Sequence, residues 1–317
     1  MKKQVFDYFV DLHQSDLKTL DGAFIRSVNK VKIEDFIKQD VVKCSHNNVD
    51  YYLKRFNIFS LNSLIFSRVY NEVGILTPPV YVTLPDKKDE KDFSYLNNLW
   101  TMQQSVDSLP LPQIHRGSYL ASHIKQHIFR EVKCGRWSIL SDPKTKEIYL
   151  KYLTPEGVDE LLNMFIADEL KTEIDRHYNN YYVCSLGQEE RYGKVIPIDM
   201  DGSRITFFVN NDFEQALKTK YTAVTPAYTL DDHYSIEERV KILKNLIASG
   251  NMPQRQCNVI KTMLNHDLSR TIKDVINIPA VKRLDSPEKE RNYTSFYDRY
   301  CQLWDYHRTQ FGSELSL

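Results

Sequence analysis

Two neighbouring stretches of this sequence determine how the rest of it is interpreted. Residues 173–184 read EIDRHYNNYYVC, and residues 195–202 read VIPIDMDG. The first stretch ends and the second begins with strand-forming residues, and glycines bracket the charged turn between them. This pattern predicts a hairpin that brings Asn180, at its entrance, beside Asp199, at its exit.

The polar side chains of these two stretches suit metal-assisted phosphoryl transfer. Asn180 offers a carbonyl oxygen and Asp199 a carboxylate, and both are hard oxygen ligands of the kind that Mg²⁺ takes. Asp175, five residues before Asn180, is placed to orient a hydroxyl nucleophile. Phosphoryl transfer depends mainly on positioning and charge neutralisation, so these residues predict an enzyme for Mg²⁺-dependent phosphoryl transfer.

Two further residues of this region each allow two interpretations. His177 either takes part in the transfer or braces the loop through hydrogen bonds. Asp201 is either a turn or helix-capping residue or a second metal ligand. The sequence leaves both pairs of alternatives open.

The part of the chain before residue 108 predicts short strands and one helix. Residues 41–44 and 49–56 flank an Asn-rich turn and predict a hairpin. A helix is expected to start with Ser60 as its capping residue and to stop at Gly74. Strands are then expected at two apolar runs, residues 80–84 and 100–106.

The remainder of the chain predicts mainly helices, after a hinge with prolines and a glycine at residues 107–117. Start signals for helices occur at Ser118, Thr154-Pro155, Ser235 and Ser286-Pro287. The order of elements predicts an α+β protein of two lobes. The small β-rich N-terminal lobe with one helix is assigned to residues 1–108, and the larger helical lobe with the catalytic loop and hairpin to residues 109–317.

The composition is that of an ordinary globular protein with balanced charge. The 317 residues include 42 Lys plus Arg and 42 Asp plus Glu, so no nucleic-acid partner and no bulk attraction to a membrane are expected. No apolar run approaches the roughly 18 to 20 residues of a transmembrane helix, and the N-terminus lacks the apolar core of a secretory signal. Five scattered cysteines without a C-x-x-C pair indicate free thiols in a reducing compartment.

At these residues the sequence resembles atypical kinases, namely the HipA-like toxins and the phosphoinositide 3- and 4-kinases. The pattern D-R-H-x-x-N that starts at Asp175 is similar to their catalytic loop, and Asp199 is similar to the metal-binding aspartate of their D-F-G element. Lys54 fits the strand lysine that holds the ATP phosphates. Two segments, residues 62–75 and 161–170, resemble the small-lobe helix and the helix before the catalytic loop of HipA-like proteins.

The resemblance covers roughly residues 20–210 and implies a serine/threonine protein kinase of HipA-like type with ATP, Mg²⁺ and a protein substrate. It implies that Asp175 and His177 are catalytic and that Asn180 and Asp199 hold the metal. It also implies a bacterial effector or toxin. The expected location is therefore the cytoplasm, or a host cell reached by a route that needs no signal peptide.

The chain departs from the kinase pattern where the nucleotide is expected. It has no G-x-G-x-x-G, and only Gly22 lies near the expected phosphate loop, where Ser27 and Asn29 are polar substitutes. Ser63 stands where these families usually place the glutamate that pairs with the strand lysine. Glu72 lies nine residues further along, about two and a half helical turns, too far to replace it simply. The metal-binding element reads D-M-D instead of D-F-G.

Two features have a binding interpretation and a structural one. Gln103, in the strand at residues 100–106, is a candidate for the adenine pocket, and a plain core strand is the alternative. Residues 115–136 contain eight basic or histidine residues and one acidic residue. They form either a solvated helix face or an anion site for a phosphorylated substrate, a lipid headgroup or an inositol polyphosphate activator. The candidate anion-binding residues are His123, Lys125, His127 and Arg130.

Three functions other than a protein kinase also fit the sequence. A phosphoinositide or small-molecule kinase is favoured if the basic helix faces the cleft. A pseudokinase scaffold that binds nucleotide or inositol polyphosphate is supported by Ser63 and the glycine-poor loop. Nucleotidyl transfer, with ATP reversed, would use the same metal ligands.

Overall fold

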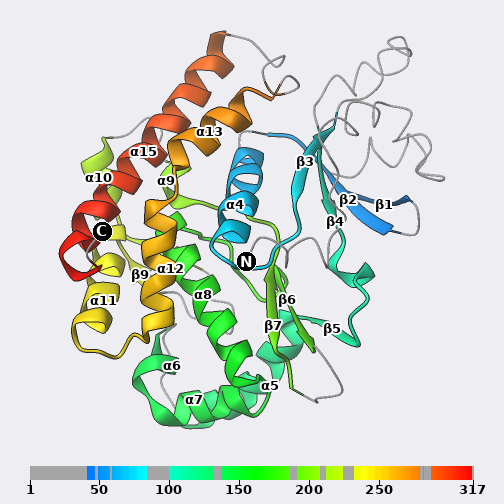
Figure 1. Cartoon of the computed structure of the whole chain (residues 1–317), viewed down its shortest axis with the longest axis vertical. Coiled ribbons are helices and arrows are strands. Elements are labelled where there is room, and N and C mark those ends of the chain that lie inside the picture. The colour runs from blue at the N-terminus through cyan, green and yellow to red at the C-terminus, as the bar shows by residue number, and fades with distance from the viewer. Residues whose placement is uncertain are drawn as a thin grey trace.

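The chain folds into a small β-rich lobe and a larger helical lobe, the α+β arrangement that the sequence predicts (Figure 1). The computed structural model describes residues 41–46, 49–57, 59–83, 100–131, 137–185, 191–207, 212–223, 232–278, 281 and 287–315. Within these residues, no helix has both the length and the apolar character needed to cross a membrane.

The small lobe is an antiparallel sheet with strand order β1-β2-β4-β3. The strands are β1 Val41–His46, β2 Val49–Arg55, β3 Val80–Thr83 and β4 Trp100–Gln104. The hairpin expected near residues 41–56 is present as β1 and β2. The strand expected to reach Val106 ends at Gln104 instead, because a short 3₁₀ helix, η2 Val106–Ser108, follows.

Helix α4, Ser60–Glu72, connects β2 to β3 and lies beside β3 in Figure 1. The expectation that Ser60 caps this helix is wrong. The side chain of Asn57 accepts from the backbone N–H groups of Phe59 (2.9 Å) and Ser60 (3.1 Å), so an Asx turn takes the place of a serine cap. Gly74 ends the helix as expected, with φ at +87°, a conformation that glycine adopts without strain.

A second antiparallel sheet, with order β5-β6-β7, lies below the first. Its strands are β5 Gln113–Arg116, β6 Tyr181–Ser185 and β7 Lys194–Pro197. The predicted hairpin is therefore present as β6 and β7, with Tyr181 opposite Pro197. Strand β5 lies inside the segment that the sequence marks as a hinge and pairs with β6, so this segment also carries structure of the larger lobe.

The rest of the chain is mainly helical, as the sequence predicts. Thr154 caps α8 by accepting from Gly157 N (3.1 Å), and Ser235 with Glu238 forms the predicted capping box of α11. A two-stranded antiparallel ribbon, β8 and β9, comes between α10 and α11 in the chain. The elements are α5 Gly117–Glu131, α6 Ser138–Ser141, α7 Pro143–Leu150, α8 Pro155–Lys171, α9 Arg204–Phe207, α10 Phe213–Lys218, β8 Tyr221–Ala223, β9 Asp232–Tyr234, α11 Ile236–Ala248, α12 Gln254–Asn265, α13 Leu268–Ile276 and α15 Pro287–Leu315.

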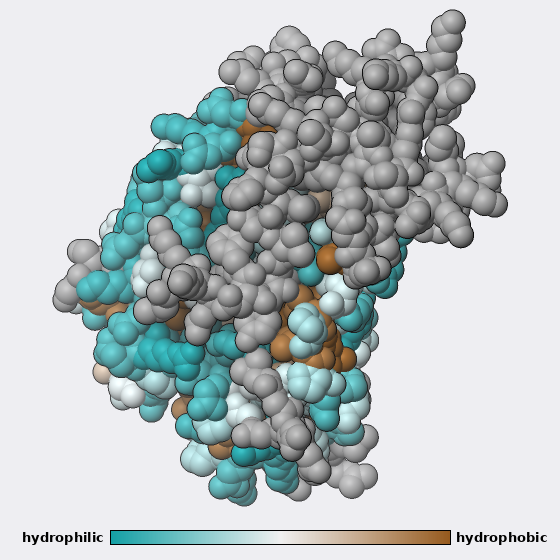
Figure 2. Space-filling view, turned by 45° about the vertical axis from the view of Figure 1, so that its right-hand side comes forward, coloured by the Kyte–Doolittle hydropathy of each residue, from teal (hydrophilic) through white to brown (hydrophobic). Residues whose placement is uncertain are grey.

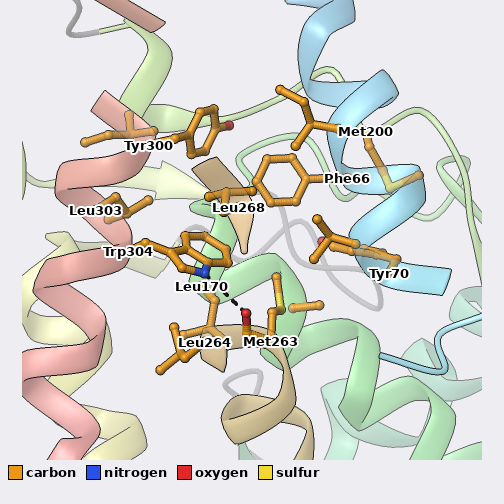
Figure 3. Close-up of a cluster of buried hydrophobic side chains, with 14 of the residues drawn as sticks. Phe66, Tyr70, Leu170, Met200, Met263, Leu264, Leu268, Tyr300, Leu303 and Trp304 are labelled. Carbon is orange, nitrogen blue, oxygen red and sulfur yellow. Dashed lines mark hydrogen bonds between the residues drawn. The ribbon is translucent and has the colours of Figure 1, made fainter. Parts of the chain in front are cut away.

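One apolar core joins α4 to the C-terminal helices (Figure 3). The ring of Phe66 on α4 lies 5.2 Å from that of Tyr300 and 6.1 Å from that of Trp304, both on α15. Trp304 Nε1 donates to the carbonyl of Met263 (3.2 Å), which satisfies the indole while its ring stays buried. Because α4 is buried against helices of the larger lobe, its position relative to that lobe is fixed by packing.

Candidate active site

The mouth of the β6–β7 hairpin brings Asn180 and Asp199 together, as the sequence predicts. The backbone N–H of Ile198 donates to the carbonyl of Asn180 (3.0 Å), one residue beyond the last paired residues of the strands. Asp199 has φ at +49°, in the left-handed region that a non-glycine residue rarely occupies. Such a conformation costs about 1–3 kcal/mol and persists only where the surrounding structure determines it.

Arg176 braces this mouth from within. Its guanidinium is buried and donates to both oxygens of Asp168 on α8, at 3.0 and 3.2 Å. Its Nη1 donates to the carbonyls of Asn180 (2.6 Å) and Ile198 (2.5 Å). Burial alone would lower the pKa of Arg176, but the charges of Asp168 and Glu173 outweigh it and raise the pKa, so the group stays charged.

The catalytic loop is also held by a buried acid–base pair. Glu173 Oε1 accepts from the backbone N–H groups of Ile174 (3.1 Å) and Asp175 (2.9 Å). The same carboxylate pairs with Lys171, which also donates to the carbonyl of Met200 (2.6 Å). Burial raises the pKa of Glu173 and lowers that of Lys171, and their mutual attraction offsets part of both effects. The pair thus connects the loop before Asp175 to the segment after Asp199.

Asp175 and His177 lie at the open side of the loop. The side chain of Asp175 is 57% exposed, whereas its carbonyl accepts from the backbone N–H of His177 and from Asn180 Nδ2, both at 2.8 Å. His177 Nδ1 accepts from the backbone N–H of Asn179 (3.1 Å), and its Nε2 lies 3.8 Å from Asp175 Oδ1. This geometry supplies the bracing contacts that one interpretation of His177 requires.

Lys54, on β2, reaches across to the segment after the hairpin. Its ammonium group donates to Asp199 Oδ1 (3.0 Å) and to Asp201 Oδ2. Burial would lower the pKa of Lys54, but the charges of Asp199 and Asp201 outweigh it and raise the pKa. The lysine proposed from its order in the chain therefore meets the proposed metal-binding aspartate, and both come from segments far apart in the sequence.

The contact of Asp201 with Lys54 was missed by sequence reasoning. Two residues of α4 also donate to Asp201. The hydroxyl of Ser63 donates to Asp201 Oδ1, and Asn62 Nδ2 donates to the backbone carbonyl of Asp201 (2.6 Å). The only signal in the sequence was Ser63 itself, which stands where a glutamate was expected. No pattern along the chain links that position to residue 201, because the contact spans 138 positions.

The donor set fits Mg²⁺ bound together with nucleotide phosphates. Because the amide nitrogen of Asn180 is engaged with the Asp175 carbonyl, the amide oxygen is the atom left for a metal, beside the carboxylate of Asp199, which is 42% exposed. Among the described residues no group of three or more His, Cys, Asp or Glu side chains could hold a metal. Mg²⁺ does not need one, since it is commonly held by one or two protein oxygens plus phosphates and water.

A buried apolar cluster lies next to the hairpin mouth and packs beneath it. Its members come from the η2 link, the strands β6 and β7 and the end of the α4–β3 loop, and Ile198, directly before Asp199, packs against it. On the surface, by contrast, Figure 2 shows hydrophobic residues in one larger area and in smaller spots among mostly hydrophilic residues of the described chain. Burial raises the pKa of Cys184 in the cluster to about 12, so the thiol is neutral. The cluster consists of Leu76, Val106, Leu109, Tyr182, Cys184 and Ile196.

The remaining candidate residues are placed less directly. Gln103 is half-buried and donates to the carbonyl of Pro78 (3.3 Å), a contact that joins β4 to the start of β3. The ring of His123 stacks on Tyr152, with 5.2 Å between ring centroids, which gives it a packing role on α5. Ser27 and Asn29 lie outside the described residues, and so do the side chains of Lys125, His127 and Arg130.

The two lobes, with a lysine from the small sheet facing an aspartate beside a β hairpin, define a kinase-like fold. The chain matches the crystal structure of a Helicobacter pylori proinflammatory kinase, CtkA, with TM-score 0.52 and 15% identity over 85% of this chain and 90% of that one. It also matches HipA in a Shewanella oneidensis MR-1 toxin–antitoxin complex of HipA, HipB and operator DNA, with TM-score 0.46 and 9% identity over 85% of this chain and 61% of that one. No family model and no curated protein matches the sequence.

Proposed function

We propose that this protein transfers the γ-phosphoryl group of ATP to a hydroxyl group, most simply that of a serine or threonine in a protein. The observation that carries the proposal is the meeting of Lys54, Asp199 and Asn180, which three separate segments bring to one place. The CtkA-like fold supports the same class of chemistry, since the H. pylori protein is a kinase. A bacterial effector or toxin role is part of this proposal and rests on the resemblance to HipA-like proteins.

Each residue has a distinct part in the proposed transfer. Asn180 Oδ1 and the Asp199 carboxylate would hold Mg²⁺, and Lys54 would contact the ATP phosphates. Bound Mg²⁺ supplies charge neutralisation on the phosphate oxygens. The exposed carboxylate of Asp175 would orient the acceptor hydroxyl and receive its proton, and His177 would keep the loop in shape.

A protein acceptor is favoured because the loop is open to solvent. Asp175 and the following Tyr178 and Asn179 are all exposed, so a side chain carried on a macromolecule can approach the carboxylate without entering a closed pocket. A lipid or metabolite kinase needs a bounded pocket for a small acceptor. The pseudokinase alternative loses part of its support, because Lys54 has a carboxylate partner even though Ser63 replaces the usual glutamate.

The test is transfer of label from γ-labelled ATP in Mg²⁺, comparing the wild type with Asp199→Ala and with Asp159→Ala, a surface carboxylate, as the matched control. The assay is run on the protein alone, with a generic basic protein, and with host-cell extract plus inositol polyphosphates. Label on protein that is lost in Asp199→Ala and kept in Asp159→Ala is expected. The melting temperature of Asp199→Ala should stay near the wild-type value, because this side chain is part-exposed.

Other outcomes assign the site differently. Label that enters only small molecules would make the protein a lipid or metabolite kinase. Label transfer that is equal in Asp199→Ala would remove the metal assignment. Nucleotide binding without transfer would favour the scaffold, and transfer from α-labelled but not γ-labelled ATP would establish nucleotidyl transfer.

An inositol polyphosphate activator is also proposed, from the basic composition of α5. A ligand that binds only the folded protein raises its melting temperature, so such a compound should stabilise the wild type. The stabilisation should disappear when Lys125 and Arg130 are changed to glutamate. If no polyanion raises the melting temperature, the basic residues of α5 form a solvated helix face and bind no activator.

A further inference from the structure

We propose that Asp201 positions Lys54 for the nucleotide phosphates, in the place of a carboxylate carried on α4; this inference rests on the proposed function. The observation is a three-residue contact. Lys54 Nζ on β2 donates to Asp201 Oδ2, and the hydroxyl of Ser63 on α4 donates to Asp201 Oδ1. One carboxylate thus links the strand that carries the lysine to the helix that lacks an acidic partner for it.

Asp201 is held firmly enough to fix another side chain. Its backbone carbonyl accepts from Asn62 Nδ2 (2.6 Å), and Asn62 Oδ1 in turn accepts from the buried hydroxyl of Tyr300 (2.7 Å). The chain of contacts therefore runs from α15 through α4 to Asp201 and ends at Lys54. A side chain supported by packed helices and satisfied hydrogen bonds keeps its partner within the narrow geometry that a phosphate contact needs.

The two aspartates that contact Lys54 are not equivalent. Asp199 Oδ1 shares Lys54 with Asp201, but the Asp199 side chain is 42% exposed and belongs to the proposed metal site. Mg²⁺ held by Asp199 would draw on the carboxylate that accepts from Lys54, so this contact would be weaker when the metal is bound. Asp201 is then the partner that remains with the lysine while the lysine reaches the phosphates.

A second metal site at Asp201 is less consistent with its surroundings. Its side chain is only 16% exposed, and each carboxylate oxygen already accepts a hydrogen bond, one from Ser63 and one from Lys54. A metal ligand would have to give up one of these contacts. The same pair of contacts is what a positioning residue requires.

The decisive experiment moves the carboxylate from residue 201 to residue 63. We would measure kcat and KM for phosphoryl transfer, and the Kd of ATP by calorimetry, for Asp201→Ala, for Ser63→Glu/Asp201→Ala and for Ser63→Gln/Asp201→Ala. Asp201→Ala should lower kcat/KM about tenfold or more, the order expected for one charged hydrogen bond. The glutamate variant should regain most of the loss, because residue 63 contacts the same carboxylate that holds the lysine and its longer side chain can occupy that place. The glutamine variant, equal in size but uncharged, should not.

The outcomes separate this inference from its alternatives. Equal behaviour of the glutamate and glutamine variants, or full activity in Asp201→Ala, would overturn it. Recovery of Asp201→Ala at high Mg²⁺ would also overturn it and make Asp201 a metal ligand. Asp201→Asn, which keeps an acceptor for Ser63, serves as a second variant if Asp201→Ala does not fold, and should show the same loss.

A nucleotide-independent measurement keeps the inference distinct from the proposed function. If the wild type neither binds ATP nor transfers label, the proposed function fails. The pairing is then decided by a double-mutant cycle on melting temperature with Lys54→Met and Asp201→Asn. A double variant that loses clearly less than the sum of the single losses supports the pairing of Lys54 with Asp201, and additive losses contradict it.

Discussion

Replacing Arg176 by methionine tests whether one buried guanidinium holds the loop at Asp175 to the mouth of the β6–β7 hairpin. Methionine fills much of the same space but cannot donate a hydrogen bond. The change leaves Asp168 buried without its cationic partner, although the hydroxyl of Tyr70 (2.8 Å) still donates to it. The carbonyls of Asn180 and Ile198 lose a donor at the same time. Removing one partner of a buried ion pair costs about 3–5 kcal/mol, so the free energy of unfolding should fall by that amount.

The assay is urea denaturation followed by tryptophan fluorescence, with Arg255→Met as the matched control. Arg255 pairs with Asp159 at a similar distance, 2.8 Å, but its side chain is 50% exposed. Loss of an exposed pair should cost less than about 1 kcal/mol. If Arg176→Met costs no more than Arg255→Met, the guanidinium is not a brace and the argument from burial is wrong. Adding Asp168→Leu to Arg176→Met should recover part of the loss, because no charge is then left buried and unpaired.

Three further variants test other contacts of the same region. Gly202→Ala places a Cβ 2.2 Å from Glu173 Oε1, which is held by its buried partners, so the free energy of unfolding should fall by about 1–3 kcal/mol. The control is Gly312→Ala, whose new Cβ has no atom within 4 Å and which should be neutral or stabilising. Calorimetry measures both variants. Tyr300→Phe removes the hydroxyl on α15 that donates to Asn62 on α4, and it should lower the free energy of unfolding by about 1–3 kcal/mol in urea denaturation. No change would show that α4 is fixed by apolar packing alone. Burial lowers the pKa of His307 to about 4, against about 6.5 in the unfolded chain. Between pH 6.5 and pH 4 the unfolded chain therefore binds a proton at this histidine and the folded chain does not. The free energy of unfolding of the wild type should fall by about 3 kcal/mol as pH is lowered through this window. His307→Gln should lack this contribution to the pH dependence.

The local elements of the fold could be predicted because their signals are local. The β6–β7 hairpin follows from two strand-forming runs around a glycine-bracketed turn, and this also fixes which residues meet at its mouth. The caps at Thr154 and Ser235 follow from side chains that satisfy N–H groups three residues away. The start of α4 was predicted wrongly for a related reason. Ser60 Oγ accepts from the backbone N–H of Asn57, and Asn57 Oδ1 accepts from that of Ser60, so the serine hydroxyl bonds back to Asn57 and does not cap the helix.

The braces of the site could not be predicted, because they join segments that the sequence does not relate. Arg176 belongs to the D-R-H-x-x-N pattern, yet its partner Asp168 lies in a helix that the sequence indicates only by its start signal at Thr154-Pro155 and by a resemblance that assigns Asp168 no role. Lys171 and Glu173 look like ordinary charged residues at a helix end, and only their complete burial reveals the pair. Charged residues are rarely this buried unless they are paired, but the sequence does not show which of them will be.

Ser63 shows how a missing residue can be misinterpreted when the chain is compared position by position. The absence of a glutamate there is, with the glycine-poor loop, the sequence support for a scaffold, since it leaves the strand lysine without its usual partner. The structure places a carboxylate beside Lys54 from residue 201, 147 positions away, and uses the serine to hold it. The proposed phosphoryl transfer requires a negative charge at a fixed distance from the lysine, and not a glutamate on α4. Since the packing of Phe66 against α15 fixes α4 next to this segment, the short serine fits where a longer acidic side chain would compete with Asp201 for the same space. Ser63→Glu in the otherwise unchanged protein should therefore destabilise the site through like-charge repulsion with Asp201, whereas the same change should be tolerated once Asp201 is alanine.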